Sequence, residues 1–144
     1  MADLNELKEN GGQLLTFSAG SEKYGFYILD TADIIEIPPI TKIPTAPDHV
    51  LGVINHRGKA VPAMDLRLRL GMEKGNYDER SCMIVVEINT MLCGIVVDRV
   101  TDVENISPED LVLSPVKGGM VYGFVMKEGS QRISILDPEK LARI

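Results

Sequence analysis

The chain has 144 residues, of which 44% are hydrophobic and 25% charged, and its formal net charge at neutral pH is −6. This length suits one compact domain or two small lobes that share a core, and the composition is that of an ordinary soluble folded protein. The acidic balance disfavours a nucleic-acid partner, because such a chain repels phosphate unless its basic residues cluster. No apolar run approaches the roughly 20 residues that span a bilayer, and the N-terminus lacks the basic start and apolar stretch of a secretion signal. We therefore expect a cytosolic protein without direct membrane insertion.

Residues 1–12 are polar and end in Asn10-Gly11-Gly12. Leu4 and Leu7 could form one amphipathic turn, but an isolated helix of that length is unstable in water. We expect a flexible N-terminal tail over 1–12 and a folded domain over 13–144.

From Gln13 onward, Gly and Pro interrupt the chain about every dozen residues, and short runs rich in Val, Ile, Tyr and Phe lie between them. This pattern is typical of a β-rich fold. A first hairpin that turns at Gly20-Ser21 has the cross-strand pairs Phe17–Tyr24 and Leu15–Phe26. The opposite face of this hairpin is more polar, and we expect it to meet solvent.

A second hairpin, turning at Asn89-Thr90, has apolar residues on both faces. Its expected pairs are Cys82–Val97, Ile84–Ile95, Val86–Cys93 and Ile88–Met91. A hairpin of this kind must lie between two packed layers. Because Cys82 and Cys93 are four residues apart along this ladder, about 13 Å separates them, whereas a disulfide needs Cα atoms within about 7 Å. We expect two free thiols.

Two further hairpins complete the predicted β-structure. One turns at Arg57-Gly58 and pairs Asn55 with Ala60 and Ile54 with Val61; the other turns near 128–130. Helices are brief and follow capping signals at Asp65, Ser107-Pro108 and Asp137-Pro138. Many short strands with few helices favour small barrels over an α/β sheet.

The sequence offers little for catalysis or for binding a metal or cofactor. The two histidines, His49 and His56, have no partners at metal-site spacing, and no nucleophile elbow, phosphate loop or dinucleotide-binding motif is present. Both cysteines lie among apolar residues, which raise a thiol's pKa. Arg57 stands out, because a guanidinium at a tight turn is a natural contact point, although a solvated turn arginine fits the local pattern equally well.

Residues Gly52–Arg67 read GVINHRGKAVPAMDLR and closely resemble the CheW family pattern G-V-I-N-L-R-G-x-V-x-P-V-x-D-L-R. The likeness covers nearly everything after Gln13, through the segments Tyr24–Ile28, Ile40–Pro44, Cys93–Val100 and Tyr122–Phe124.

This resemblance implies an all-β fold with a few short helices, in which two SH3-like five-stranded β-barrel lobes with interleaved strands share an apolar interface. It implies a non-enzymatic adaptor, without cofactor or metal, that is monomeric alone. Its implied partners are the cytoplasmic tip of a methyl-accepting chemoreceptor and the regulatory domain of the histidine kinase CheA, within receptor clusters at the membrane.

The resemblance also implies a receptor-binding site. It contains Arg57 and the stretch Asp33-Ile34, with Asn55 and Gly58 shaping the hairpin and with Ile40 and Thr41 lining a groove. One departure lies inside the motif, where His56 replaces the usual Leu. A titratable ring there could weaken an apolar contact or make it sensitive to pH.

Other readings remain open. The same fold occurs in the C-terminal domain of CheA and in the N-terminal half of CheV, but this chain shows no kinase or receiver domain, so a free-standing adaptor is the simplest expectation. A β-barrel that binds a small apolar ligand would show an internal cavity. An enzyme would show a buried titratable pair with perturbed pKa values in a cleft.

Overall fold

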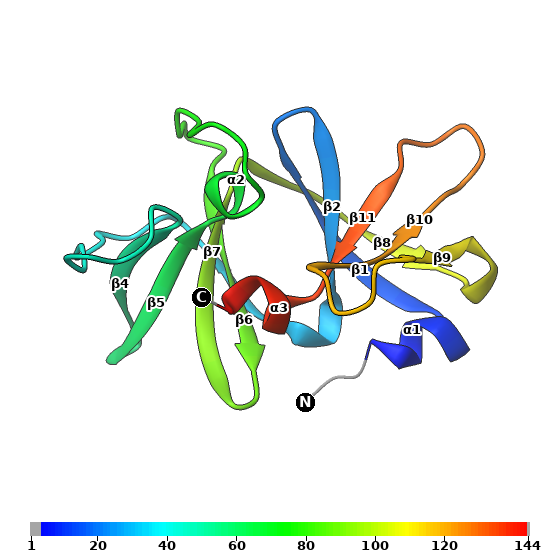
Figure 1. The fold of residues 1–144 in the computed structure, drawn as a ribbon, viewed down its shortest axis with the longest axis horizontal. Coiled ribbons are helices and arrows are strands. Elements are labelled where there is room, and N and C mark those ends of the chain that lie inside the picture. The colour runs from blue at the N-terminus through cyan, green and yellow to red at the C-terminus, as the bar shows by residue number, and fades with distance from the viewer. Residues whose placement is uncertain (1–3, 144) are drawn as a thin grey trace.

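Two β-sheets make up most of the computed structural model, which describes residues 4–143 (Figure 1). The first sheet has six strands in the order β8 (Arg99–Ile106), β1 (Gly12–Ala19), β2 (Glu22–Tyr27), β11 (Ile133–Leu136), β10 (Val121–Val125) and β9 (Leu111–Leu113). The second has five strands in the order β3 (Thr31–Ile35), β6 (Cys82–Ile88), β7 (Met91–Val97), β5 (Lys59–Asp65) and β4 (Val50–His56).

The sequence of one lobe is inserted within the sequence of the other. It leaves the six-stranded sheet after β2, completes the whole five-stranded sheet, and returns to the first sheet at β8. We call the six-stranded unit the terminal lobe and the five-stranded unit, residues 31–97, the inserted lobe. The expected two-lobed β-fold is confirmed, but the terminal lobe has six strands instead of five, because the three-residue strand β9 adds to its edge.

An apolar seam joins the two lobes. Phe17 and Phe26 of the terminal lobe, with ring centroids 4.8 Å apart, lie in one buried cluster with Ile84 and Ile95 of the inserted lobe. Met83 and Val96, on the opposite face of β6 and β7, belong to the separate core of the inserted lobe. The second hairpin is therefore buried on both faces, as its sequence predicts.

The predicted registers of the first three hairpins are confirmed pair by pair. The fourth hairpin is also present as β10 and β11. Both cysteines are free, and burial raises the pKa of the Cys93 thiol to about 11. Two predicted caps hold as well: Asp65 accepts a hydrogen bond from Leu68 N ahead of α2 (Leu66–Arg69), and Asp137 accepts one from Glu139 N ahead of α3 (Pro138–Ala142).

The expectation of a flexible tail over residues 1–12 is wrong for residues 4–12. Residues Asn5–Asn10 form helix α1, and Leu7 is fully buried. Leu4 and Leu7 pack in a cluster with Tyr27 and Ile106 of the terminal lobe. These tertiary contacts supply the stabilisation that an isolated helix lacks. Residues 1–3 lie outside the described part of the chain.

The second face of the first hairpin does not meet solvent as expected. The Thr16 hydroxyl is buried and shares a hydrogen bond of 2.8 Å with the hydroxyl of Thr101 on β8. Gly25 is buried on the other strand, where an added Cβ would lie 3.3 Å from both Leu14 and Ile133. Side chains of the neighbouring strands β8 and β11 contact this face, through Thr101 and Ile133. The alternation of residues within the hairpin could not reveal these contacts.

Two arginines of α2 tie the inserted lobe to the terminal lobe. Arg67 donates to both oxygens of Asp98, at 2.8 and 2.5 Å, and Gly20 N donates to the same carboxylate at 2.9 Å. The hydrogen bonds from Arg67 hold the pKa of Asp98 below its usual range. Arg69 donates to carbonyl oxygens at the end of α3, those of Leu141, Lys140 and Arg143.

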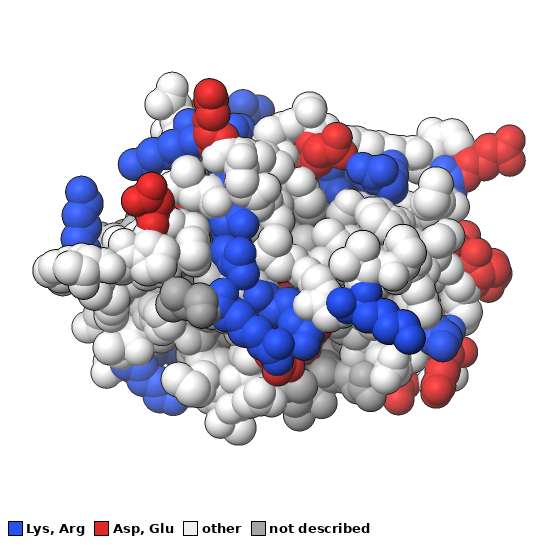
Figure 2. Space-filling view, viewed as in Figure 1, with Lys and Arg blue, Asp and Glu red and all other residues white. Residues whose placement is uncertain are grey.

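Basic side chains gather over α3 at the centre of the face drawn in Figure 2. Arg69 uses its guanidinium on the carbonyl groups of that helix, and Arg143 pairs with Glu139 at 3.2 Å. These cations therefore serve contacts within the protein. Among residues 4–143, no helix has the length and apolar character needed to cross a bilayer.

Candidate protein-docking site

The turn between β4 and β5 presents Arg57 to solvent in a fixed backbone geometry. Arg57 and Gly58 both have positive φ, 53° and 81°, which is the type I′ geometry of a two-residue hairpin. Asn55 Oδ1 accepts a hydrogen bond of 2.9 Å from Gly58 N and braces the turn. Arginine is an unfavourable choice for a left-handed position. Arg57 therefore combines this backbone conformation with a side chain that is 79% exposed.

Asp33 of β3 meets this turn although it lies 24 residues away in the sequence. Its Oδ2 accepts a hydrogen bond of 3.1 Å from Arg57 Nη2. Its Oδ1 accepts one of 2.9 Å from Ile34 N, which fixes the carboxylate. Ile34, the next residue of β3, is 45% exposed. The structure thus brings Asp33, Asn55, Arg57 and Gly58 together. We call this group, with Ile34 as the residue that follows Asp33 on β3, the arginine turn.

Backbone pairing between the two edges of the inserted sheet explains this approach. Beyond β3, Thr41 forms an antiparallel bridge with Val53 of β4, through two hydrogen bonds of 2.9 Å. Gly52 is required there, because a Cβ on it would lie 2.0 Å from the Thr41 carbonyl oxygen. Thr41 is exposed, while Ile40 is partly buried against the core of the lobe. Ile40 and Thr41 therefore close the lobe beside β4.

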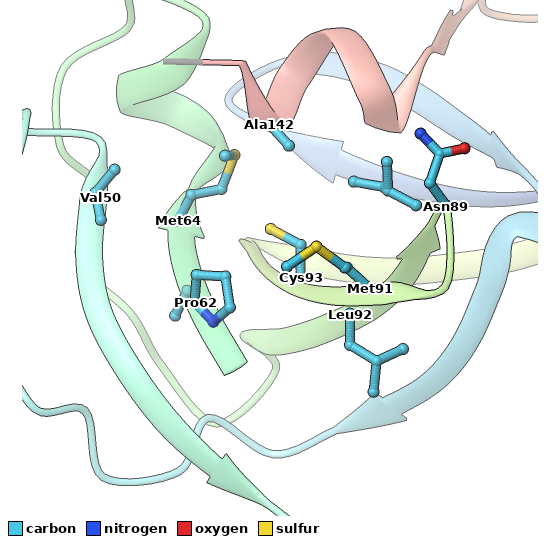
Figure 3. A pocket seen from close by; sticks show the side chains of 10 residues that line it. Val50, Pro62, Met64, Asn89, Met91, Leu92, Cys93 and Ala142 are labelled. Atoms are coloured by element: carbon cyan, nitrogen blue, oxygen red, sulfur yellow. The ribbon is translucent and has the colours of Figure 1, made fainter. Parts of the chain in front are cut away.

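A second feature, which sequence reasoning missed, is an apolar pocket of about 330 Å³ in the same lobe (Figure 3). Pro62 and Met64 of β5 lie on one side, Met91, Leu92 and Cys93 of β7 lie on the other, and Ala142 of α3 lies above. The pocket exists because β5 and β7 pair only over Ala63–Asp65 and Gly94–Val96. Met91, at the exposed turn, is 70% accessible.

This pocket lies at the surface, outside the filled lobe cores. The cores of both lobes and the seam between them are occupied by side chains. No local pattern signals such a pocket, because it depends on where a parallel pairing of distant strands stops. An exposed apolar site of this size suits an apolar side chain of a partner protein or a small apolar ligand.

Two buried acidic groups have raised pKa values, because burial raises the pKa of Asp30 and also that of Asp65. Asp30, 6% exposed between β2 and β3, has its pKa raised to about 6, mainly by desolvation and also by the charge of Asp137. None of these carboxylates lines the apolar pocket. Desolvation likewise lowers the pKa of His49. Within residues 4–143, no group of three or more His, Cys, Asp or Glu side chains could hold a metal ion.

Comparison with known proteins places this geometry in a family. Residues 13–144 match the model of the CheW-like domain. The chain is 37% identical to the chemotaxis protein CheW of Klebsiella aerogenes over 105 residues, which are 73% of this chain and 63% of that protein. It is 32% identical to CheW of Helicobacter pylori over 137 residues, covering 91% of this chain and 81% of that protein.

A solved structure agrees with the sequence relatives. The crystal structure of the scaffolding protein TtCheW from Thermoanaerobacter tengcongensis superposes with a TM-score of 0.86 at 31% identity, covering 93% of this chain and 94% of that one. The two-lobed fold and these relatives define a non-enzymatic scaffold. The chain belongs to the CheW family of chemotaxis scaffold proteins.

Proposed function

We propose that the protein is a passive adaptor that couples methyl-accepting chemoreceptors to the histidine kinase CheA. The arginine turn is the observation that carries this proposal. Arg57 is a cation on a rigid two-residue turn, Asp33 orients it, and Ile34, the residue after Asp33, has an exposed side chain. A charged fork next to an apolar contact is typical of a protein-binding surface.

The receptor tip is the partner that we assign to the arginine turn. The family resemblance describes that tip as a long antiparallel coiled-coil hairpin, whose surface alternates apolar and charged residues. Arg57 can reach a carboxylate on such a helix while Ile34 contacts its apolar stripe. Because the Arg57 side chain is 79% exposed, exchanging Asp33 for a carboxylate of the partner costs little.

A coupling protein needs a second surface for its second partner, and the apolar pocket supports that role. On the side that faces the pocket, residues 59–62 of β5 and residues 91–93 of β7 have no partner strand. Open strand edges beside an apolar pocket suit a partner that adds a short extended segment and inserts one apolar side chain. We assign this surface to the regulatory domain of CheA. Such an adaptor works in the cytosol and is recruited to receptor clusters at the membrane.

Substitution of Arg57 tests the receptor assignment. Arg57→Asp reverses the charge at the turn and should lower capture of the protein by an immobilised receptor-tip fragment at least tenfold, while circular dichroism stays unchanged. Arg80→Asp is the matched control, because Arg80 is also exposed and pairs with an aspartate, Asp78, at 3.6 Å. Equal capture of both variants would remove the arginine turn from the receptor site.

The size of the apolar pocket also favours a second candidate function, binding of a small apolar ligand. Ala142→Trp should fill the pocket and distinguish the two functions. Under the adaptor proposal, this variant loses capture of the CheA regulatory domain and retains capture of the receptor fragment. If it instead loses saturable binding of an apolar dye such as anilinonaphthalene sulfonate and keeps both protein partners, the pocket serves a small ligand.

A further inference from the structure

His56 lies directly beside the arginine turn and faces the same carboxylate oxygen as Arg57. Its Nε2 is 3.8 Å from Asp33 Oδ2, and Arg57 Nη2 is 3.1 Å from that atom. The two basic side chains differ in exposure, because His56 is 10% accessible whereas Arg57 is 79% accessible. One acidic oxygen thus has a largely buried basic neighbour and an exposed one.

The strand geometry keeps the His56 ring in this place. Side chains two residues apart on a strand point to the same face, so His56 lies on the face of β4 that carries the buried residue Ile54. Lys59 of β5 stands opposite His56 in the ladder and is exposed. The charged groups next to the ring are therefore Asp33 from β3, Arg57 from the turn and Lys59 from β5. Asp33 is the acidic member of this set.

We propose that His56 and Arg57 compete for Asp33, so that uptake of a solvent proton by His56 loosens Arg57 and makes it available to a carboxylate of a partner. When the His56 ring is neutral, the negative charge of Asp33 and the positive charge of Arg57 cancel. With a charged ring, the same three side chains carry one net positive charge, and His56, which is nearly buried, depends on Asp33 for compensation more than the solvated guanidinium does. A protonated His56 thus favours an acidic partner surface.

Histidine is the side chain whose proton uptake ordinarily falls between about pH 5 and 8. The family pattern has Leu at this position, which cannot take up a proton, so the proposal concerns a property of this chain. Its second half, release of Arg57 toward a receptor, rests on the proposed function.

The first experiment needs no partner. Nuclear magnetic resonance of the full chain follows the ring signals of His56 and the side-chain Nε–H signal of Arg57 between about pH 5 and 8. The two signals should change with one common midpoint, and His56→Leu should make the Arg57 signal independent of pH. Asp33→Asn should move the His56 midpoint to lower pH, and Arg57→Gln should move it to higher pH, because each removes one neighbouring charge.

His49→Gln is the matched control, since it removes the other histidine and should leave the coupled signals unchanged. A native Arg57 signal that ignores the titration of His56, or a His56 midpoint unaffected by Asp33→Asn, overturns the competition.

The second experiment measures binding of the receptor-tip fragment to the native protein at about pH 6 and pH 8. One unit charge gained about 4 Å from a solvated carboxylate corresponds to roughly fivefold tighter binding at the lower pH. His56→Leu should abolish this difference, and His49→Gln should keep it. Binding that is equally tight at both pH values, with or without His56, overturns the role of His56 and leaves the adaptor proposal intact. No binding at either pH overturns the adaptor proposal, while the resonance experiment still decides the competition.

Discussion

The molecule contains two Arg–Asp pairs with opposite designs. Arg67 and Asp98 make two contacts, both side chains are only about one-quarter exposed, at 26% and 24%, and Gly20 N adds a third hydrogen bond from the other lobe. Arg57 and Asp33 share a single contact, and the arginine is 79% exposed.

This difference separates a structural pair from a surface available to partners. The Arg67–Asp98 pair is bidentate, and Asp98 accepts hydrogen bonds from Arg67 of one lobe and Gly20 of the other. These hydrogen bonds lower the pKa of Asp98, so the pair stabilises the arrangement of the lobes. In the second pair the Arg57 guanidinium is solvated, although the Asp33 carboxylate is only 27% exposed, and a single contact to an exposed arginine contributes little to stability. The protein can therefore exchange the second pair for a partner's carboxylate without loosening the fold.

The largest effect is expected at the structural pair. Asp98→Asn removes the charge that accepts three hydrogen bonds and should lower the free energy of unfolding by about 2–3 kcal/mol. Urea denaturation measures this loss. Asp78→Asn is the control, because Asp78 pairs with Arg80 at an exposed site and its loss should cost much less stability. Equal small losses would contradict the structural role of Asp98.

Asp30 is a third case to compare with the two paired aspartates, because it is buried and no ion pair in residues 4–143 includes it. Its folded pKa of about 6 exceeds the ordinary value of 3.8. The native state therefore binds more protons than the unfolded state between these values, and stability falls as pH rises through this window. Asp30→Asn should raise the free energy of unfolding at neutral pH by on the order of 2 kcal/mol and flatten this dependence. A loss of stability at neutral pH would contradict the account.

The pH dependence of stability at acid pH tests Asp98, whose effect has the opposite sign to that of Asp30. Its folded pKa is depressed, so its contribution is present above the ordinary carboxyl value and is lost as pH falls through the folded pKa. The gap in unfolding free energy between the native protein and Asp98→Asn should narrow as pH falls below about 4. A gap that stays constant would mean that the charge of Asp98 is irrelevant to stability.

The smallest effect on stability is expected at the arginine turn. Asp33→Asn should change the free energy of unfolding by less than about 0.5 kcal/mol, while capture by the receptor fragment changes measurably because Arg57 loses its orienting partner. Thermal denaturation and pull-down on the same preparation give both values. A loss of stability as large as that of Asp98→Asn would show that the two pairs do not differ in design.

Local patterns predicted the hairpins well. Alternating apolar residues around Gly20-Ser21, Arg57-Gly58 and Asn89-Thr90 fix both the turn and the register, since a slip of one residue would invert every side chain. The burial of β6 and β7 on both faces followed from the same alternation.

Features that depend on distant contacts were not predictable in this way. Helix α1 is stable because Leu7 packs among residues such as Tyr27 and Ile106. The apolar pocket depends on the parallel pairing of β5 with β7, and Arg67 meets Asp98 across 31 positions. The grouping of Asp33 with Arg57 was expected from the family resemblance alone, and nothing in the sequence indicated that His56 faces the same carboxylate.

The most direct test of the adaptor account is assembly of all three components. The CheA regulatory domain is passed over an immobilised receptor-tip fragment, with and without this protein. The account predicts that the kinase domain is retained only when the protein is present, and that Arg57→Asp abolishes this retention. Retention of the kinase domain without the protein, or binding of each partner without formation of the three-component complex, would contradict it.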